Sequence, residues 1–212
     1  MVTTWRPMAC GIGKYAEQQV TALRRQGYII DILSPPEGDG DFCMQLLGGL
    51  RPLRLFKVAW AYDAVWVHYT QHFFFVSDSR LNRLVTSFAF LILMLVFGRR
   101  FTFIVHESGV NVDQGNSGGL RRLIDRWWWA RAHRVVFHSH RERDAFAAHH
   151  GMKPEGGNLE IWPHERDFER CTDLDRDDAR AMLGVEPDVV LLVCLGFIQP
   201  HKGFDRVIEA LA

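Results

Sequence analysis

The chain has 212 residues, of which 48% are hydrophobic and 24% charged, so it can bury one sizeable core and is not a disordered chain. Its 25 basic and 25 acidic residues cancel at pH 7, which excludes the overall positive charge typical of nucleic-acid-binding domains. The cysteines lack Cys-x-x-Cys spacing and indicate reduced thiols in the cytoplasm; they are Cys10, Cys43, Cys171 and Cys194.

Apolar strand segments alternate with helical segments from the start of the chain. The predicted strands cover residues 2–5, 28–33, 64–68, 101–106, 134–138 and 159–162. The predicted helices cover residues 13–26, 80–97, 120–132 and 141–149, with Gly27 and Gly98 at two helix ends. This alternation predicts an α/β fold with a doubly wound, Rossmann-like parallel sheet covered on both faces.

The composition changes after residue 164, which predicts a domain boundary. Residues 1–164 form the expected first domain, and the charged segment 165–188, with a short helix at 177–183, is the expected linker. Residues 189–195 and 204–212 then predict a strand and a helix. Because one strand and one helix cannot bury a core, we expect 189–212 to be the truncated beginning of a second domain.

The longest uncharged run covers residues 84–98. As a helix it reaches about 22 Å, short of the roughly 30 Å hydrocarbon core of a bilayer. A buried helix is therefore favoured over a membrane span. Glycine-rich segments at 35–49 and 107–119 follow predicted strands and are candidate binding loops.

Polar residues gather where the predicted strands end. In an open parallel sheet, ligands bind beyond the carboxyl ends of the strands. A single histidine there is commonly structural, but four strand ends in succession favour a site. The side chains at these ends are His68 with Tyr69 and Gln71, His106 with Glu107, His138 with Ser139, and His164.

The first turn contains Gly11 and Gly13, directly before Lys14 and Tyr15. Glycine lets a ligand approach the backbone closely, and the helix that follows directs its free N–H groups at the turn. Such a turn is suited to binding a phosphate group. An ordinary tight turn is the alternative. The spacing also resembles a dinucleotide fingerprint, but Asp31 lies inside the second predicted strand rather than at its end, which disfavours a nicotinamide enzyme.

The chain closes with another arrangement of a strand, a loop that begins with glycine, and a helix. Gly196 begins this loop, and Lys202 precedes the final helix. The ammonium of Lys202 could bind a diphosphate as a point charge, although a solvated surface lysine is the alternative.

Together these segments resemble the retaining glycosyltransferases of family 4, which have the GT-B fold of two Rossmann-like domains. The resemblance rests on segments in the family's order, namely GIGKYAEQQVTALRRQGY, FIVHES, IWPHERDF and LGFIQPHKGFD. It implies a hexosyltransferase that moves a sugar from a nucleotide-diphosphate sugar to a glycan or lipid-linked acceptor, without a metal or resident cofactor. It touches nearly the whole chain.

The resemblance also implies residue roles. His106 would contact the transferred sugar, and Glu107 would orient the His106 ring. Gly11 and Gly13 would approach the donor phosphate or the acceptor. The donor diphosphate would be bound by Gly196 and Lys202. We expect the acceptor to meet Lys14, Tyr15, Tyr69, Gln71 and Ser139.

Three departures from the family pattern matter. Phe197 stands where many relatives have arginine, and Glu165 replaces the glycine of a Pro-His-Gly turn. The glutamate pair that holds sugar and ribose belongs further into the second domain and is absent from this chain. We therefore expect little or no transferase activity from the chain as it stands.

The helix predicted at 120–132 is the candidate membrane contact. Leu120, Leu123, Ile124, Trp127 and Trp128 form one apolar stripe at helical spacing. Trp129 lies opposite the stripe, beside Arg122 and Arg126, and an outward tryptophan among arginines suits a membrane surface or a lipid-linked acceptor. Packing of Trp129 on a neighbouring loop is the alternative. We expect a cytoplasmic protein, peripheral at the inner face of the membrane.

Two other classes of function stay open. His68, His106 and His138 could ligate zinc in a metal-dependent hydrolase, although no element carries the usual His-x-x-x-His spacing. The chain could also be a non-catalytic domain that binds a glycan or a protein partner.

Overall fold

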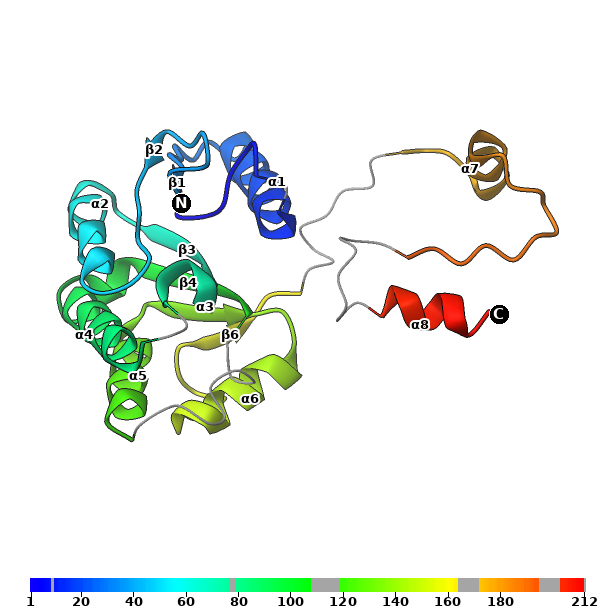
Figure 1. Cartoon of the computed structure of the whole chain (residues 1–212). Helices are drawn as coiled ribbons and strands as arrows, with labels where there is room; N and C mark the ends of the chain where they lie inside the picture. The colour runs from blue at the N-terminus through cyan, green and yellow to red at the C-terminus, as the bar shows by residue number, and fades with distance from the viewer. Residues whose placement is uncertain (9, 77–78, 108–118, 164–171, 195–202, 212) are drawn as a thin grey trace. The chain divides into compact units, whose positions relative to one another are not determined.

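The computed structural model describes residues 1–8, 10–76, 79–107, 119–163, 172–194 and 203–211. The chain divides into two units, Met1–Phe168 and Glu169–Ala212. In Figure 1 the larger unit runs from blue to yellow, and the smaller unit, which holds α7 and α8, is orange to red.

One parallel sheet organises the larger unit. Its strands are β1 (Leu33–Ser34), β2 (Phe42–Cys43), β3 (Val65–Thr70), β4 (Phe101–Glu107), β5 (Arg134–Phe137) and β6 (Leu159–Ile161). Strand β1 pairs with β2, and β3 to β6 pair in chain order. Val2 makes parallel bridges to Leu33 of β1 and to Val67 of β3, which joins the two sets in the order β2, β1, Val2, β3, β4, β5, β6. The order reverses between Val2 and β3, which is where open α/β sheets bind ligands.

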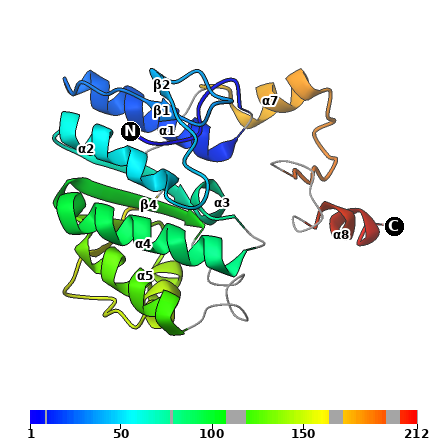
Figure 2. The same cartoon turned by 60° about the vertical axis from the view of Figure 1, so that its left-hand side comes forward.

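Helices cover both faces of this sheet. They are α1 (Gly11–Arg25), η1 (Arg51–Arg54), α2 (Leu55–Ala61), α3 (Gln71–Phe74), α4 (Arg80–Phe97), η2 (Gly98–Arg100), α5 (Gly119–Arg131) and α6 (His140–His150), followed in the smaller unit by α7 (Arg176–Leu183) and α8 (Phe204–Glu209). Figure 2 shows α2, α4 and α5 side by side over one face. Helix α1 packs on the other face, where Tyr15 meets Ile104 and Val136.

The main core lies between the strands and the layer of α2, α4, α5 and α6. Alternation along β3 explains its composition, because successive side chains of a strand face opposite sides of the sheet. Val65, Val67 and Tyr69 join the main core, whereas Trp66 and His68 face α1. The aromatic rings stack tightly, as Phe90 on Trp128 at a centroid distance of 4.8 Å shows.

Most predicted elements of the larger unit are confirmed. The helix predicted at 80–97 has these bounds, with the Ser79 hydroxyl accepting from the Asn82 N–H at its start. Gly27 has φ 91° directly after α1, the left-handed conformation that a helix-ending glycine provides.

Gly98 has a different role from the one predicted. Its φ of −51° is ordinary for any residue. A Cβ atom at this position would lie 2.2 Å from the carbonyl oxygen of Arg131. Glycine is needed here because the end of α4 touches the end of α5, and not because of its backbone angles.

Several shorter elements differ from the predictions. The strand predicted at 28–33 is reduced to its end, and Ile29 is 94% exposed. Strand β2 lies in the glycine-rich segment 35–49, for which no strand was predicted, and helix α2 lies in residues 50–63, for which no element was predicted. Residues 189–194, predicted to form most of a strand, form none. The short helix predicted at 177–183 is confirmed as α7, which has Asp175 as N-cap and Gly184, φ 66°, as C-cap.

Helix α5 is rotated relative to the prediction. Trp129 is 2% exposed, so it does not face outward, and its ring meets Phe146 of α6 at 5.0 Å. Trp127 is 51% exposed instead. The helix turns a polar pair inward, because the Arg121 guanidinium and the Asp125 carboxylate bind each other at 3.1 Å in the core.

Candidate functional site

Three of the strand-end histidines meet at one place under α1. The Tyr15 ring is 5.7 Å from His68, 5.5 Å from His106 and 5.3 Å from His138, in each case edge to face. His106 is the extra residue of a bulge in β4, since Val105 pairs with Tyr69 and Glu107 with Thr70. Bulges of this kind redirect a side chain near a site. The predicted convergence of strand ends is therefore present.

A hydrogen bond joins two of these rings. His68 Nδ1 lies 2.9 Å from His106 Nε2, and the rings are stacked at 5.2 Å. Burial, followed by the nearby charge of His106, holds the pKa of His68 well below 6.5, so His68 is neutral at pH 7. His68 Nε2 is buried and has no hydrogen-bond partner among the described residues.

These facts favour one arrangement of the protons on His68 and His106. A buried N–H without an acceptor is rarer than an unused lone pair. We therefore assign the proton of His68 to Nδ1, from which it is donated to His106 Nε2. A neutral His106 then keeps its own proton on Nδ1 and has a fixed tautomer.

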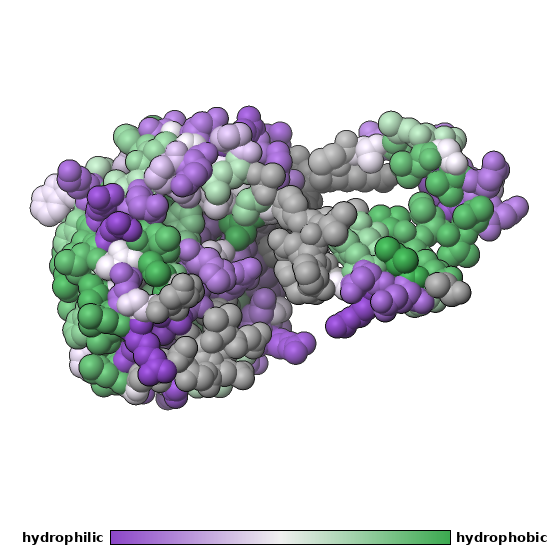
Figure 3. Space-filling view, viewed as in Figure 1, coloured by the Kyte–Doolittle hydropathy of each residue, from purple (hydrophilic) through white to green (hydrophobic). Residues whose placement is uncertain are grey.

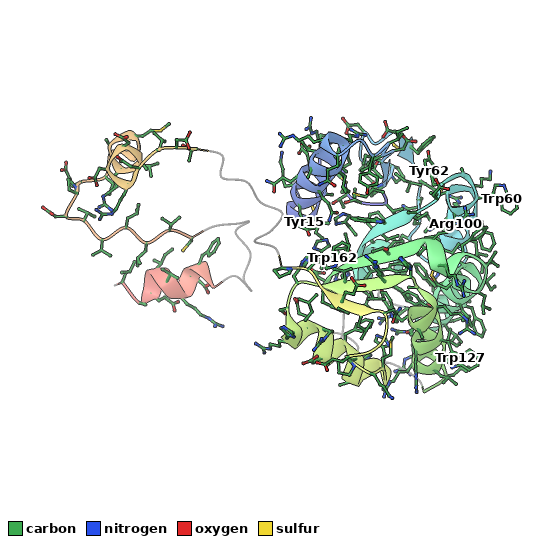
Figure 4. The ribbon with its side chains drawn as sticks, turned by 180° about the vertical axis from the view of Figure 1, so that it is seen from behind. Tyr15, Trp60, Tyr62, Arg100, Trp127 and Trp162 are labelled. Atoms are coloured by element: carbon green, nitrogen blue, oxygen red, sulfur yellow. The ribbon has the colours of Figure 1, made fainter. Side chains whose placement is uncertain are left out.

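The third ring is fixed from the neighbouring strand. His138 Nδ1 lies 2.9 Å from the carbonyl oxygen of Trp162, just after β6. The Trp162 indole packs on Trp66 at 5.5 Å and its N–H donates to Glu160 at 3.1 Å. Figure 4 shows Trp162 beside Tyr15. Trp66 and Trp162 were not predicted as part of the site, because in the sequence each lies inside a predicted strand and is expected to belong to the core.

The amino end of α1 lies at the reversal of strand order. A Cβ atom on Gly13 would lie 3.2 Å from the Thr4 carbonyl oxygen, so Gly13 lets the helix approach the first strand closely. Gly11 is exposed and has open space around it. The hydroxyl of Thr4 is buried and has no partner within the described ranges. Thr4 is a site residue that the sequence patterns did not single out.

Two predicted acceptor residues lie on the other face of the sheet. Tyr69 stacks on Phe74 at 5.6 Å and meets Trp129 at 5.0 Å, so it belongs to the main core. Gln71 lines, with Tyr69, a small cavity of about 10 Å³ next to the buried Asp125. The structure does not bring Tyr69 or Gln71 together with His106.

Two further predicted residues have local partners, and a third is exposed. Ser139 is the N-cap of α6, accepting from the Glu142 N–H at 3.3 Å and donating to its carboxylate at 2.9 Å. The Lys14 ammonium lies 3.3 Å from the Glu17 carboxylate on the surface of α1. Glu107 is exposed, and the partner found at His106 Nε2 is His68. Gly196, Lys202 and His164 lie outside the described residues.

The zinc-hydrolase alternative would need three ligating side chains around one ion. In the structure the facing nitrogens of His68 and His106 lie 2.9 Å apart, at hydrogen-bond distance from each other. No group of three metal-ligating side chains occurs in the part of the chain that is described.

The parallel sheet, its reversal of strand order and the polar strand ends define a Rossmann-like α/β domain, a class in which ligands bind at that edge.

Two curated proteins match part of the chain, and both are named D-inositol 3-phosphate glycosyltransferase. The protein of Geodermatophilus obscurus is 37% identical over 83 residues, which are 39% of this chain and 18% of that protein. The protein of Rhodococcus opacus is 32% identical over 92 residues, 43% of this chain and 20% of that protein. The matches relate the chain to glycosyltransferases over about a fifth of their length. No protein-family model and no solved structure matches the chain.

Proposed function

We propose that this chain is the acceptor-side part of a retaining, metal-independent glycosyltransferase of the GT-B type. Such an enzyme transfers a sugar from a nucleotide-diphosphate sugar to a glycan or lipid-linked acceptor. The observation that carries the proposal is the meeting of His68, His106 and His138 beneath α1, at the sheet edge where ligands bind in this class. The names of the two partial relatives support it.

Each residue then has a chemical task. When the sugar leaves, negative charge develops on the phosphate and positive charge on the anomeric carbon. The N–H groups at the start of α1, near Gly11 and Gly13, favour an anion, and Lys202 with Gly196 would hold the diphosphate. His106, whose ring is held by the hydrogen bond to His68, would contact a hydroxyl of the transferred sugar.

The relatives' printed name suggests the kind of acceptor to test first. It contains a phosphorylated cyclitol, D-inositol 3-phosphate. A phosphate of this kind fits the amino end of α1, because free N–H groups and the helix dipole favour anions there.

Isothermal titration calorimetry tests the proposal with inositol phosphates, sugar phosphates, and UDP- and GDP-sugars as probes. We expect the chain to bind at least one member of this panel. His106→Ala should weaken that binding by roughly tenfold or more, because a hydrogen bond to a sugar hydroxyl is lost. The matched control is His72→Ala, since His72 is exposed on α3.

Equal affinity of His106→Ala and the unaltered chain would contradict the proposed site, provided both unfold at similar temperatures. A chain that binds none of the probes would contradict the proposed function. A radiolabelled transfer assay completes the test, with little or no turnover expected from this chain alone.

A further inference from the structure

An exposed apolar surface covers the outside of the helical layer, away from the candidate site. We call it the apolar face. Figure 3 shows hydrophobic residues gathered along the edge of the larger unit where α4 and α5 lie. Contiguous apolar surfaces of this kind mark sites of interaction. Its residues are Trp60 of α2, Leu81, Phe88, Ile92, Leu95 and Val96 of α4, and Leu120, Leu123 and Trp127 of α5.

Packing on both sides of α5 turns these residues outward. Trp128 stacks on Phe90 of α4, while Trp129 meets Phe146 of α6. Leu123 and Trp127 lie on the side of α5 that faces away from both contacts, and both are exposed. The guanidinium of Arg131 lies 5.6 Å above the Trp127 ring and places a positive charge at the apolar face.

Helix α2 is fixed to the same layer. The Arg100 guanidinium donates to the carbonyl oxygens of Ala59 at 2.7 Å and Tyr62 at 3.0 Å, at the end of α2. Trp60 remains 80% exposed. Figure 4 shows Trp60 and Trp127 at the same edge of the larger unit. Aromatic rings at the margin of an apolar surface are typical of membrane interfaces.

The exposed charged side chains on the helices that carry the apolar face are basic, although the exposed Asp63 lies just after α2. Within η1, α2, α4, η2 and α5 the acidic side chain present is Asp125, which is buried against Arg121. The chain as a whole has equal numbers of acidic and basic residues, so these helices hold an excess of cations relative to the rest of the chain. The exposed ones are Arg51, Arg54, Lys57, Arg80, Arg99, Arg122, Arg126 and Arg131.

A depression borders the amino end of α4. It has a volume of about 400 Å³ and is lined by Gly48, Gly49, Leu50, Arg51, Arg54 and Asn82. The guanidinium of Arg51 donates to the Leu47 carbonyl oxygen at 2.6 Å, and that of Arg54 to the Gln45 carbonyl oxygen at 3.2 Å. Both guanidinium groups are therefore held at the rim, where a lipid phosphate could bind them.

We propose that the apolar face docks the larger unit on an anionic lipid surface, with Arg51 and Arg54 contacting headgroups. The excess of cations selects lipid over a second copy of this chain, because two such faces would repel each other. The helical segment Arg80–Arg100, which joins α4 and η2, has the length and hydropathy of a membrane span, but half of its most apolar 18-residue window is buried in the protein. It therefore lies on the surface of the bilayer rather than across it.

The residues of this proposed membrane contact differ from the sequence prediction, which placed Trp129 at the membrane surface. The aromatic anchor is Trp127, and Trp129 belongs to the core.

Co-sedimentation with vesicles tests the proposal. We expect the 212-residue chain to bind phosphatidylcholine vesicles only when about a third of the lipid is phosphatidylglycerol, and to be released by high salt. A double variant, Leu95→Ser with Trp127→Ser, should lower the partition coefficient by roughly tenfold or more, because two apolar side chains no longer enter the interface. Arg51→Gln with Arg54→Gln should also lower it by roughly tenfold.

The matched control is Ile29→Ser, which removes an apolar side chain that is 94% exposed elsewhere in the same unit. It should bind like the unaltered chain. All replaced positions are exposed, and unfolding curves check that each variant is folded. The proposal is overturned if the chain does not sediment with anionic vesicles, or if Ile29→Ser lowers binding as much as the double variants. Self-association that depends on Trp127 without lipid binding would assign the face to a second copy instead.

Discussion

His68 is the buried residue on which the geometry of His106 depends. Its ring is enclosed by Tyr15, His106 and His138, and it has no acidic partner among the contacts described for it. A neutral imidazole in this position can fix a neighbouring tautomer but resists protonation. The same burial that organises the site therefore makes it sensitive to acid.

We predict that the free energy of unfolding decreases as the pH falls below 6.5, the ordinary pKa of histidine. Burial lowers the pKa of folded His68, so below 6.5 the unfolded chain binds more protons than the folded one. Between pH 7 and 5 one such group contributes a loss of at most about 2 kcal/mol. Urea titrations of His68→Phe should lack this part of the pH dependence, whereas His72→Phe should retain it. An unchanged slope in His68→Phe would contradict the assignment.

Gly98 provides a second test at a single residue. Gly98→Ala would bring a Cβ atom to 2.2 Å from the Arg131 carbonyl oxygen, so α4 and α5 must separate. We expect a loss of about 2 kcal/mol or more in denaturant unfolding. Gly157→Ala is the control because its Cβ would have open space, and it should change stability by less than about 0.5 kcal/mol. Equal stabilities of the two variants would contradict the described contact.

The orientation of α5 shows where sequence patterns fail. Helical periodicity places Leu120, Leu123 and Trp127 in the core, because apolar residues are expected to face inward. The helix instead buries Arg121 and Asp125, which satisfy each other and allow Trp128 and Trp129 to pack. A reading of one helix at a time cannot anticipate a buried ion pair.

Two neighbouring tryptophans test this orientation. Trp129→Ala should reduce the free energy of unfolding by about 3–5 kcal/mol, because it leaves a cavity between β-strands and α6. Trp127→Ala should change it by less than about 1 kcal/mol, since Trp127 is half exposed. Thermal and urea unfolding of both variants would settle the comparison, and the reverse ranking would restore the orientation predicted from the sequence.

Elements with a clear pattern were predictable, including the short strands β5 and β6 and the short helix α7, whereas β2 and α2 were not. Helix α4 has the predicted bounds because Ser79 caps a continuous apolar run. Strand β2 has two residues inside a glycine-rich segment, and too few side chains to show a period. Among the site residues, histidines at strand ends were predictable from the topology alone. The bond from His68 to His106 was not, because it depends on a bulge.

At the scale of the whole molecule, the larger unit presents two separate surfaces. The strand-end cluster beneath α1 is the proposed site for a sugar phosphate, and the apolar face on the α4 side is the proposed site for lipid. Because the sheet lies between α1 and the layer of α2, α4 and α5, both can be occupied at once. Such an arrangement would hold the candidate site beside a membrane while leaving it open to a soluble donor.

The central claim is that the sheet edge at His106 binds a sugar phosphate, and histidine-selective NMR during a ligand titration tests it most directly. The side-chain signals of His106, and the amide signals of Gly11 and Gly13, should shift together and saturate at one ligand concentration. Shifts confined to the depression at Gly48 and Gly49, or no saturable shift with any sugar phosphate or nucleotide sugar, would contradict the account.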